Sequence, residues 1–96
     1  MRRRYILTYD ICDPKRLRMT FKVARAYGDH LQLSVFECLM NEMERISLED
    51  DLKEVMNQKE DQVLLIDLGW ADGESSCRIV AWGRSYQPAE AGPVVV

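Results

Sequence analysis

The stretch Arg4–Pro14, with the sequence RYILTYDICDP, decides the fold of this chain. Its first part, Tyr5–Ile11, consists mostly of apolar, β-branched and aromatic residues, which is typical of a central strand. Asp10 stands at the C-terminal end of this strand, where a bare carboxylate is costly unless it is paired, hydrogen-bonded or metal-bound. Asp13 and Pro14 then end the strand and start a helix, as its N-cap and its first helical residue.

A basic amphipathic helix is predicted over Pro14–Tyr27. Apolar residues recur in it at helical spacing and form a stripe that faces the core. Lysines and arginines occupy other positions, so the outer surface of the helix is basic, and Gly28 is a natural residue to end it. The basic residues are Lys15, Arg16, Arg18, Lys22 and Arg25.

Further β-type segments follow this helix. Leu31–Leu39 forms one strand or two, because no Asn-Gly or Asp-Gly turn marks a break in it. Gln62–Leu68 and Cys77–Trp82 are strands joined as a hairpin with a long connection. Val94–Val96 is a short apolar tail, which makes physical sense as an additional C-terminal strand on a sheet edge.

A second helix is predicted before the hairpin. Ser47 caps it, with Asp50 three residues on as in a capping box, and Asn57 ends it. Met40–Arg45 is interpreted as a polar connector. The resulting order, β-α-β(β)-α-β-β, predicts an α+β fold: a ferredoxin-like β-α-β-β-α-β sandwich with two helices on one face of an antiparallel sheet. Residues 1–96 are expected to form one such domain.

The composition is that of a globular protein, with 47% hydrophobic and 30% charged residues. No apolar run approaches the roughly 20 residues that span a bilayer, so no contact with a membrane is expected. The cysteines are three in number and lack metal-ligand spacing. They are interpreted as buried, reduced thiols, which indicates a cytoplasmic protein.

The net charge of −3 conceals a polarised chain. Residues 1–30 carry eight Lys/Arg against three Asp/Glu, and residues 31–96 carry five against thirteen, so the two parts have charges of +5 and −8. The basic part is suited to a polyanion, although a solvated helix face is the commoner explanation of such a pattern.

The sequence contains no Gly-rich phosphate loop, no Gly-x-Ser-x-Gly elbow and no histidine-based metal motif. His30 is the single histidine, and a lone histidine at a helix–strand junction is more often structural. Acidic metal chemistry at Asp10 is then the main catalytic option, with an ordinary strand end as the alternative. One carboxylate is a poor Mg²⁺ site, but a two-fold dimer would bring two copies of Asp10 together.

Several of these residues resemble the CRISPR-associated Cas-two (Cas2) family. Tyr9–Ile11 ends the first strand, the basic run Lys15–Arg18 follows it, and Gln32–Glu37 carries the string QLSVFE. The similarity runs from the first strand to the apolar tail, which is essentially the whole chain. One departure is visible, because the position before the second strand motif is often basic in the family and is His30 here.

The resemblance implies a homodimer in which Asp10 of each protomer faces a shared Mg²⁺ or Mn²⁺ site. It also implies endonuclease activity on RNA or duplex DNA with Asp10 as the catalytic residue, and a role in spacer acquisition with the Cas-one (Cas1) integrase. The segment 85–96 is expected to pack on the partner protomer. By position in the family pattern, nucleic-acid contacts are expected from Tyr9, Lys15, Arg16, Arg18, Ser34 and Phe36, and dimer contacts from Asp10, Val94, Val95 and Val96.

Two functions fit these residues. In a nuclease, the metal lowers the pKa of a bound water that attacks the phosphodiester, while Arg16 and Arg18 position the backbone. In a non-catalytic scaffold that bridges integrase dimers, the same basic helix binds duplex phosphate without sequence preference and Asp10 is an interface residue. An RNA-recognition module is a weaker third interpretation, because the glycine- and aromatic-rich strand signature of such modules is absent.

Overall fold

The computed structural model describes residues 1–71 and 78–85. For residues 78 and 79 it describes the backbone alone. Its elements follow in the order β-α-β-β-α-β-β. They are β1 (Arg3–Asp10), α1 (Pro14–Tyr27), β2 (Asp29–Gln32), β3 (Val35–Met40), α2 (Glu42–Val55), β4 (Gln62–Trp70) and β5 (Arg78–Gly83). The predicted Val94–Val96 strand lies outside the described residues.

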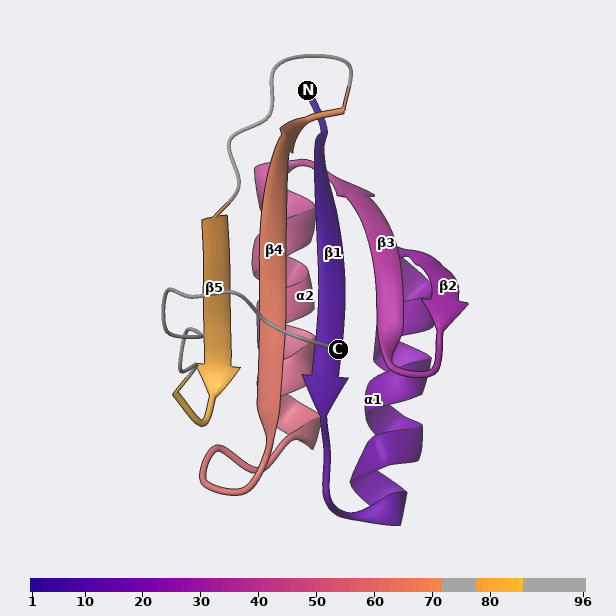
Figure 1. Ribbon diagram of the computed structural model, residues 1–96, viewed down its shortest axis with the longest axis vertical. Helices are drawn as coiled ribbons and strands as arrows, with labels where there is room; N and C mark the ends of the chain where they lie inside the picture. The colour runs from indigo at the N-terminus through magenta and orange to yellow at the C-terminus, as the bar shows by residue number, and fades with distance from the viewer. Residues whose placement is uncertain (72–77, 86–96) are drawn as a thin grey trace, which may run out of the picture.

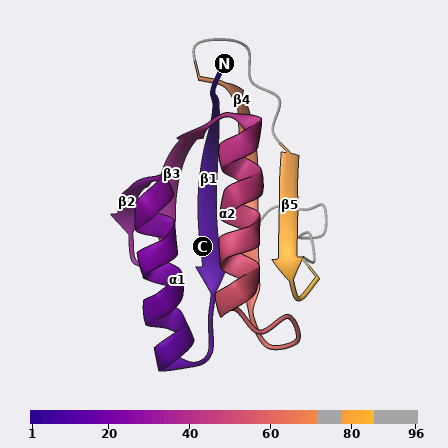
Figure 2. The same cartoon turned by 180° about the vertical axis from the view of Figure 1, so that it is seen from behind.

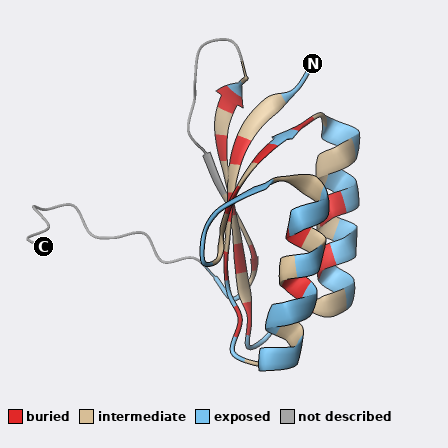
Figure 3. Ribbon diagram, turned by 90° about the vertical axis from the view of Figure 1, so that its right-hand side faces the viewer, coloured by how far each residue is buried: buried red, intermediate tan, exposed pale blue. Residues whose placement is uncertain are grey.

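The strands form one antiparallel sheet in the order β2-β3-β1-β4-β5 (Figure 1). β1 is the central strand, as its apolar sequence predicts, and it pairs with β3 on one side and β4 on the other. Both helices pack on the same face of the sheet, as the view from behind and the edge-on view show (Figures 2 and 3). The ferredoxin-like fold is therefore confirmed, with β5 added beside β4 as the second strand of the expected hairpin.

The segment Leu31–Leu39 belongs to two strands rather than one. β2 and β3 pair with each other, and the chain turns between them at Leu33 and Ser34. Gly28 ends α1 beside β3, where a Cβ atom would lie 2.5 Å from the carbonyl oxygen of Glu37. A side chain at this position would clash with backbone, so the close approach of α1 to β3 requires glycine.

The predicted start of the second helix at Ser47 is wrong. α2 begins at Glu42 and Asn41 is its N-cap. The first helical turn therefore lies within Met40–Arg45, the segment interpreted from the sequence as a polar connector. The Asn41 side chain accepts a hydrogen bond from the Glu44 backbone N–H at 2.8 Å, and the Glu44 carboxylate accepts one from the Asn41 backbone N–H at 2.9 Å. This reciprocal capping box satisfies two N–H groups that a helix start leaves open, and it sets the helix boundary.

The core lies between the helices and the sheet. Its largest fully buried apolar members come from β1, β3, α2 and β4, and they are Leu7, Phe36, Met40, Leu48, Leu52 and Leu65. Cys38 is buried among them, and desolvation of its thiol, with smaller contributions from Asp29 and Glu37, raises its pKa to about 11. Cys12 is exposed, contrary to the expectation that it is buried. Within the part of the chain that the structure describes, no helix is long and apolar enough to cross a membrane.

Candidate functional site

Asp10 is the last residue of β1, at the end of the sheet where α1 begins (Figure 1). Its side chain is 75% exposed, so the carboxylate is open to solvent. One carboxylate oxygen, Oδ2, accepts a hydrogen bond from Arg84 Nη2 at 2.8 Å. Asp10 is thus an exposed, ion-paired acid at the end of the central strand, which agrees with the position predicted for it.

A hollow with a volume of about 670 Å³ opens beside Asp10. Its walls come from the end of β1, from one side of the middle of α1, and from the turn between β2 and β3. A backbone hydrogen bond of 3.2 Å from Tyr9 N–H to Ser34 O joins two of these walls. The lining residues are Tyr9, Asp10, Ile11, Leu17, Arg18, Phe21, Lys22, Leu33 and Ser34.

This hollow combines apolar walls with a few charged groups. Leu17, although on the apolar stripe of α1, is 41% exposed here, and Leu33 is 90% exposed. Arg18 and Lys22 are exposed on the same side of the helix and supply positive charge next to the single carboxylate of Asp10. Such a surface can accept a phosphate group beside an apolar moiety.

Four of the predicted site residues come together in this hollow: Tyr9, Asp10, Arg18 and Ser34. Lys15 is exposed in the first turn of α1 but does not line it. Lys22 does line it, and the helical spacing of i and i+4 from Arg18 was the signal that placed it on the same side. Val94, Val95 and Val96 lie outside the described residues.

Arg16 is held in an ion-pair network instead of facing the hollow. Its Nε donates to Asp61 Oδ2 at 2.9 Å and its Nη2 donates to Glu60 Oε2 at 2.9 Å. The hydrogen bond to Asp61 is the main reason that the pKa of the Arg16 guanidinium is raised. In this structure the guanidinium is therefore paired with two carboxylates, and its contact with nucleic acid stays a prediction.

Phe36 is fully buried, so the structure differs from the prediction of a direct contact at this residue. Its ring packs against Tyr9, Phe21 and His30, with centroid separations of 6.2, 5.5 and 4.9 Å. Tyr9 is 6% exposed, and burial raises the pKa of its hydroxyl. This cluster supports the hollow from beneath, which is a packing role rather than a contact role.

His30 makes packing and hydrogen-bond contacts, which is the structural role expected of a lone histidine at a helix–strand junction. Its ring lies edge-on to Phe21 at 5.0 Å, and its Nε2 is 2.8 Å from the carbonyl oxygen of Leu33. These contacts hold the turn between β2 and β3 against α1. His30 does not line the hollow.

The Asp10 carboxylate is the group in this hollow that could bind a divalent metal ion. Among the described residues there is no group of three or more His, Cys, Asp or Glu side chains that could hold a metal. Mg²⁺, however, is often bound through one or two carboxylates together with waters and phosphate oxygens. The exposed Asp10 carboxylate fits that type of coordination when a second carboxylate or a phosphate completes it.

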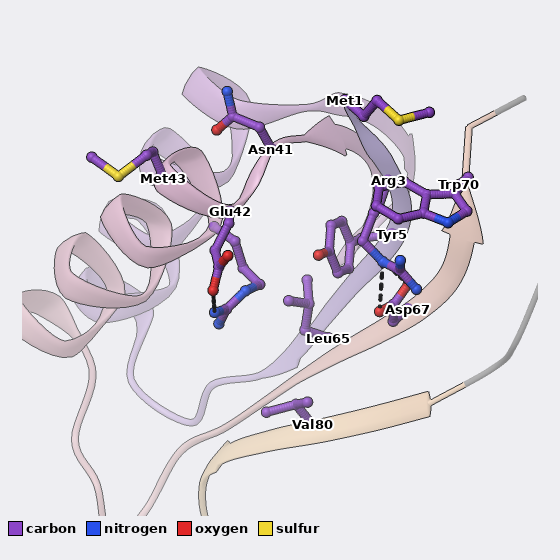
Figure 4. A pocket seen from close by; sticks show the side chains of 11 residues that line it. Met1, Arg3, Tyr5, Asn41, Glu42, Met43, Leu65, Asp67, Trp70 and Val80 are labelled. Atoms are coloured by element: carbon purple, nitrogen blue, oxygen red, sulfur yellow. Dashed lines mark hydrogen bonds and ion pairs between the residues drawn. The ribbon is translucent and has the colours of Figure 1, made fainter.

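A second hollow lies at the opposite end of β1 (Figure 4). Arg3 dominates it, because its Nε lies 3.0 Å from Asp67 Oδ2 and its guanidinium carbon lies 4.5 Å from the centre of the Trp70 ring. Asp67 is 2% exposed and also accepts a hydrogen bond from Gly69 N–H at 2.8 Å. These pairings explain Arg3 and Asp67 as structural residues.

The fold and the hollow together define a small ferredoxin-like protein with an acid at the exit of its central strand and cations on the adjoining helix. Residues 1–74 match the model of the family described as CRISPR associated protein Cas2. The chain belongs to this family, as the similarity of its strand motifs indicates.

Similar proteins carry the same family name. The CRISPR-associated endoribonuclease Cas2 1 of Rhodospirillum rubrum is 34% identical over 92 residues, which cover 96% of this chain and 89% of the relative. The CRISPR-associated endoribonuclease Cas2 of Geobacter sulfurreducens is 36% identical over 92 residues, covering 96% of each chain.

Solved structures of this family have the same fold. Streptococcus pyogenes Cas2 at pH 6.5 superimposes with a TM-score of 0.61 at 31% identity, over 65% of this chain and 81% of that one. A crystal structure described as cas2 gives a TM-score of 0.68 at 24% identity, over 95% of this chain and 98% of that one.

Proposed function

We propose that this protein is a metal-dependent endonuclease that cleaves RNA or duplex DNA as a homodimer in the cytoplasm and takes part in spacer acquisition with the Cas1 integrase. The observation that carries the nuclease proposal is the exposed Asp10 carboxylate at the mouth of a hollow that also contains Arg18 and Lys22. The endoribonuclease names of the relatives from Rhodospirillum rubrum and Geobacter sulfurreducens support the same activity.

Each of these residues would have a distinct role in such a reaction. Asp10 from each of two protomers would hold Mg²⁺ or Mn²⁺, which supplies a water of lowered pKa as the nucleophile. Arg18 and Lys22 bind the phosphate backbone and offset negative charge that develops at the scissile phosphate. Ser34, at the turn that borders the hollow, offers a hydroxyl to the same backbone. Arg16, through Asp61, positions the start of α1.

A non-catalytic scaffold that bridges integrase dimers is the second candidate. The observation that favours it is the ion pair between Asp10 and Arg84, because a carboxylate already neutralised by an arginine is a weaker ligand for a metal. In that case Arg18 and Lys22 bind duplex phosphate and Asp10 is an interface residue.

A metal-titrated cleavage assay on single-stranded RNA and duplex DNA separates the two functions. For a nuclease, cleavage of at least one substrate rises with added Mg²⁺ or Mn²⁺, disappears with a chelator, and is lost in Asp10→Ala. A scaffold binds the duplex and leaves both substrates intact at every metal concentration. Cleavage that persists in the chelator would contradict the metal-dependent mechanism.

The Arg18→Ala/Lys22→Ala double variant is expected to weaken nucleic-acid binding equally for unrelated sequences. Both residues are exposed cations. Among the described residues, no pattern of side chains that would form paired hydrogen bonds to base edges accompanies them, so they should contact phosphates. Each lost phosphate contact should make the slope of log K against log salt shallower by about one. Fluorescence anisotropy at several salt concentrations measures this slope.

Lys53→Ala is the matched control. Lys53 is an exposed lysine on α2, away from the hollow, and it pairs with Glu49 of the same helix. This substitution should leave the slope unchanged. A loss confined to particular sequences in the double variant would indicate base recognition instead of backbone binding.

Deletion of residues 92–96 is expected to weaken the proposed dimer. Three consecutive valines at a chain end are suited to adding a strand to the sheet of a partner protomer, where they would be buried and would cover an exposed edge. Sedimentation at low micromolar concentration should show monomer in the truncated protein. An unchanged dimer would remove the C-terminal segment from the proposed interface.

A further inference from the structure

We propose that Arg84 is a positioning residue for Asp10: it is the counter-ion that a divalent metal must displace, and it then remains beside the metal to receive a phosphate. This inference rests on the proposed role of Asp10 as a metal ligand. It starts from the 2.8 Å contact between Arg84 Nη2 and Asp10 Oδ2.

The sheet places Arg84 within reach of Asp10 although 74 residues separate them in sequence. Asp10 is paired in register with Gln62 on β4, and Gln62 is paired with Gly83 on β5. Neighbouring strands lie about 4.8 Å apart, so β5 is about 10 Å from β1 at this level. Arg84 follows Gly83 directly, and an extended arginine side chain can cross β4 to the strand end of β1.

The backbone of Arg84 is anchored on both sides. Its N–H donates to the carbonyl oxygen of Asp61 at 2.9 Å, and its carbonyl oxygen accepts from Gln62 Nε2 at 3.0 Å. Gln62 Nε2 also donates to the carbonyl oxygen of Ser85 at 2.8 Å. Gly83 has a φ of 92° and sits so close to Asp61 that a Cβ atom would overlap its carbonyl group. These main-chain contacts therefore fix the position of the Arg84 Cα atom, from which the side chain extends.

The side chains of the pair, by contrast, are free to exchange partners. They are 43% and 75% exposed, so water can replace either group and the pair is weak. A divalent cation and a guanidinium repel each other at contact distance, so binding of both at the same carboxylate oxygen is unfavourable. Metal binding at Oδ2 therefore displaces the Arg84 side chain. Its anchored backbone keeps the freed guanidinium near Asp10, where it can bind a phosphate in the two-point manner of arginine.

Binding of Mn²⁺ to the full chain, measured by calorimetry without nucleic acid, tests this inference. Arg84→Gln is expected to lower the dissociation constant about two- to five-fold, the range that an exposed ion pair contributes. The gain should shrink as ionic strength rises, because salt screens the pair. Arg84→Lys retains the charge and should fall between Arg84→Gln and the unaltered protein.

Arg2→Gln is the matched control, since Arg2 is 55% exposed, pairs with Glu44 and lies beyond the opposite end of β1. It should bind Mn²⁺ with unchanged affinity. Equal or weaker binding by Arg84→Gln, while Asp10→Asn loses binding, overturns the inference and leaves the proposed function intact. Binding by Asp10→Asn with the affinity of the unaltered protein overturns the proposed metal site and this inference with it. Thermal melts of each variant confirm that the fold is retained.

Discussion

Asp10→Asn is expected to reduce metal-stimulated cleavage by about 100-fold or more, because loss of a charged metal ligand should cost at least as much as loss of one hydrogen-bond donor to a transition state. The fold should be unaffected. Asp10 is 75% exposed at a strand end and its one ion pair is a surface pair, so the free energy of unfolding should change by less than about 0.5 kcal/mol. Initial rates at saturating Mg²⁺, together with a thermal melt, measure both effects.

Asp29→Asn is the control for this prediction. Asp29 is an exposed acid in β2, on the edge of the sheet, and it does not line the hollow. The same chemical change at that position should leave cleavage intact. If purified Asp10→Asn cleaves as fast as Asp29→Asn, the activity belongs to another group or to a contaminant.

Local sequence signals were enough to predict most of the fold. The apolar run of β1, the Asp13-Pro14 helix start and the basic periodicity of α1 all appear in the structure. These signals succeed because each depends on residues near one another in the chain. The break within Leu31–Leu39 could not be predicted, because the turn at Leu33 and Ser34 has no glycine, asparagine or aspartate to mark it.

The start of α2 was missed although a signal for it is present. Asn41 followed by Glu44 has the spacing of a capping box, and so does Ser47 followed by Asp50. The two patterns compete over the same polar segment. In the structure the Asn41 capping box is the one that forms, and Leu48 lies fully buried in the second turn of the helix that it starts.

The site was predictable where position in one strand defines it, and not where distant segments meet. Asp10 follows from its place at the end of β1. Arg84 does not, because its contact depends on the register of three strands. Arg16 and Arg18 are two residues apart in α1 and so lie on different sides of the helix, but the sequence does not show that one side faces Asp61 and the other lines the hollow. The partner of Arg16 comes from the loop before β4, which places a buried acid next to the first turn of α1.

Asp61 is that buried acid, and it holds together the end of the sheet that carries Asp10. Its side chain is fully buried and accepts hydrogen bonds from Arg16 Nε at 2.9 Å, from Asn57 N–H at 2.8 Å and from Cys12 N–H at 3.4 Å. Burial alone would raise the pKa of this carboxyl. The hydrogen bonds from Arg16, Asn57 and Cys12 together outweigh burial, so the pKa lies below its ordinary value of 3.8.

Asp61→Ala is therefore expected to lower the free energy of unfolding by about 2–4 kcal/mol. The substitution removes a charge-assisted pair and leaves the partly buried N–H of Asn57 without its acceptor. In a domain of this size such a loss lowers the melting temperature by about 10 °C or more. Glu60→Gln is the control, because Glu60 binds the same guanidinium from a side chain that is 60% exposed, and surface pairs contribute little.

The pH dependence of stability provides an independent readout of the same carboxyl. Because the folded pKa of Asp61 is lowered, its stabilisation is fully present above the unfolded pKa and is lost as the pH falls through the lower folded value. Asp61→Ala lacks this contribution at every pH, so its melting temperature should fall less than that of the unaltered protein between about pH 5 and pH 2. Melting temperatures of Asp61→Ala that match those of Glu60→Gln across this range would rule out Asp61 as the anchor of the Asp10 end of the sheet.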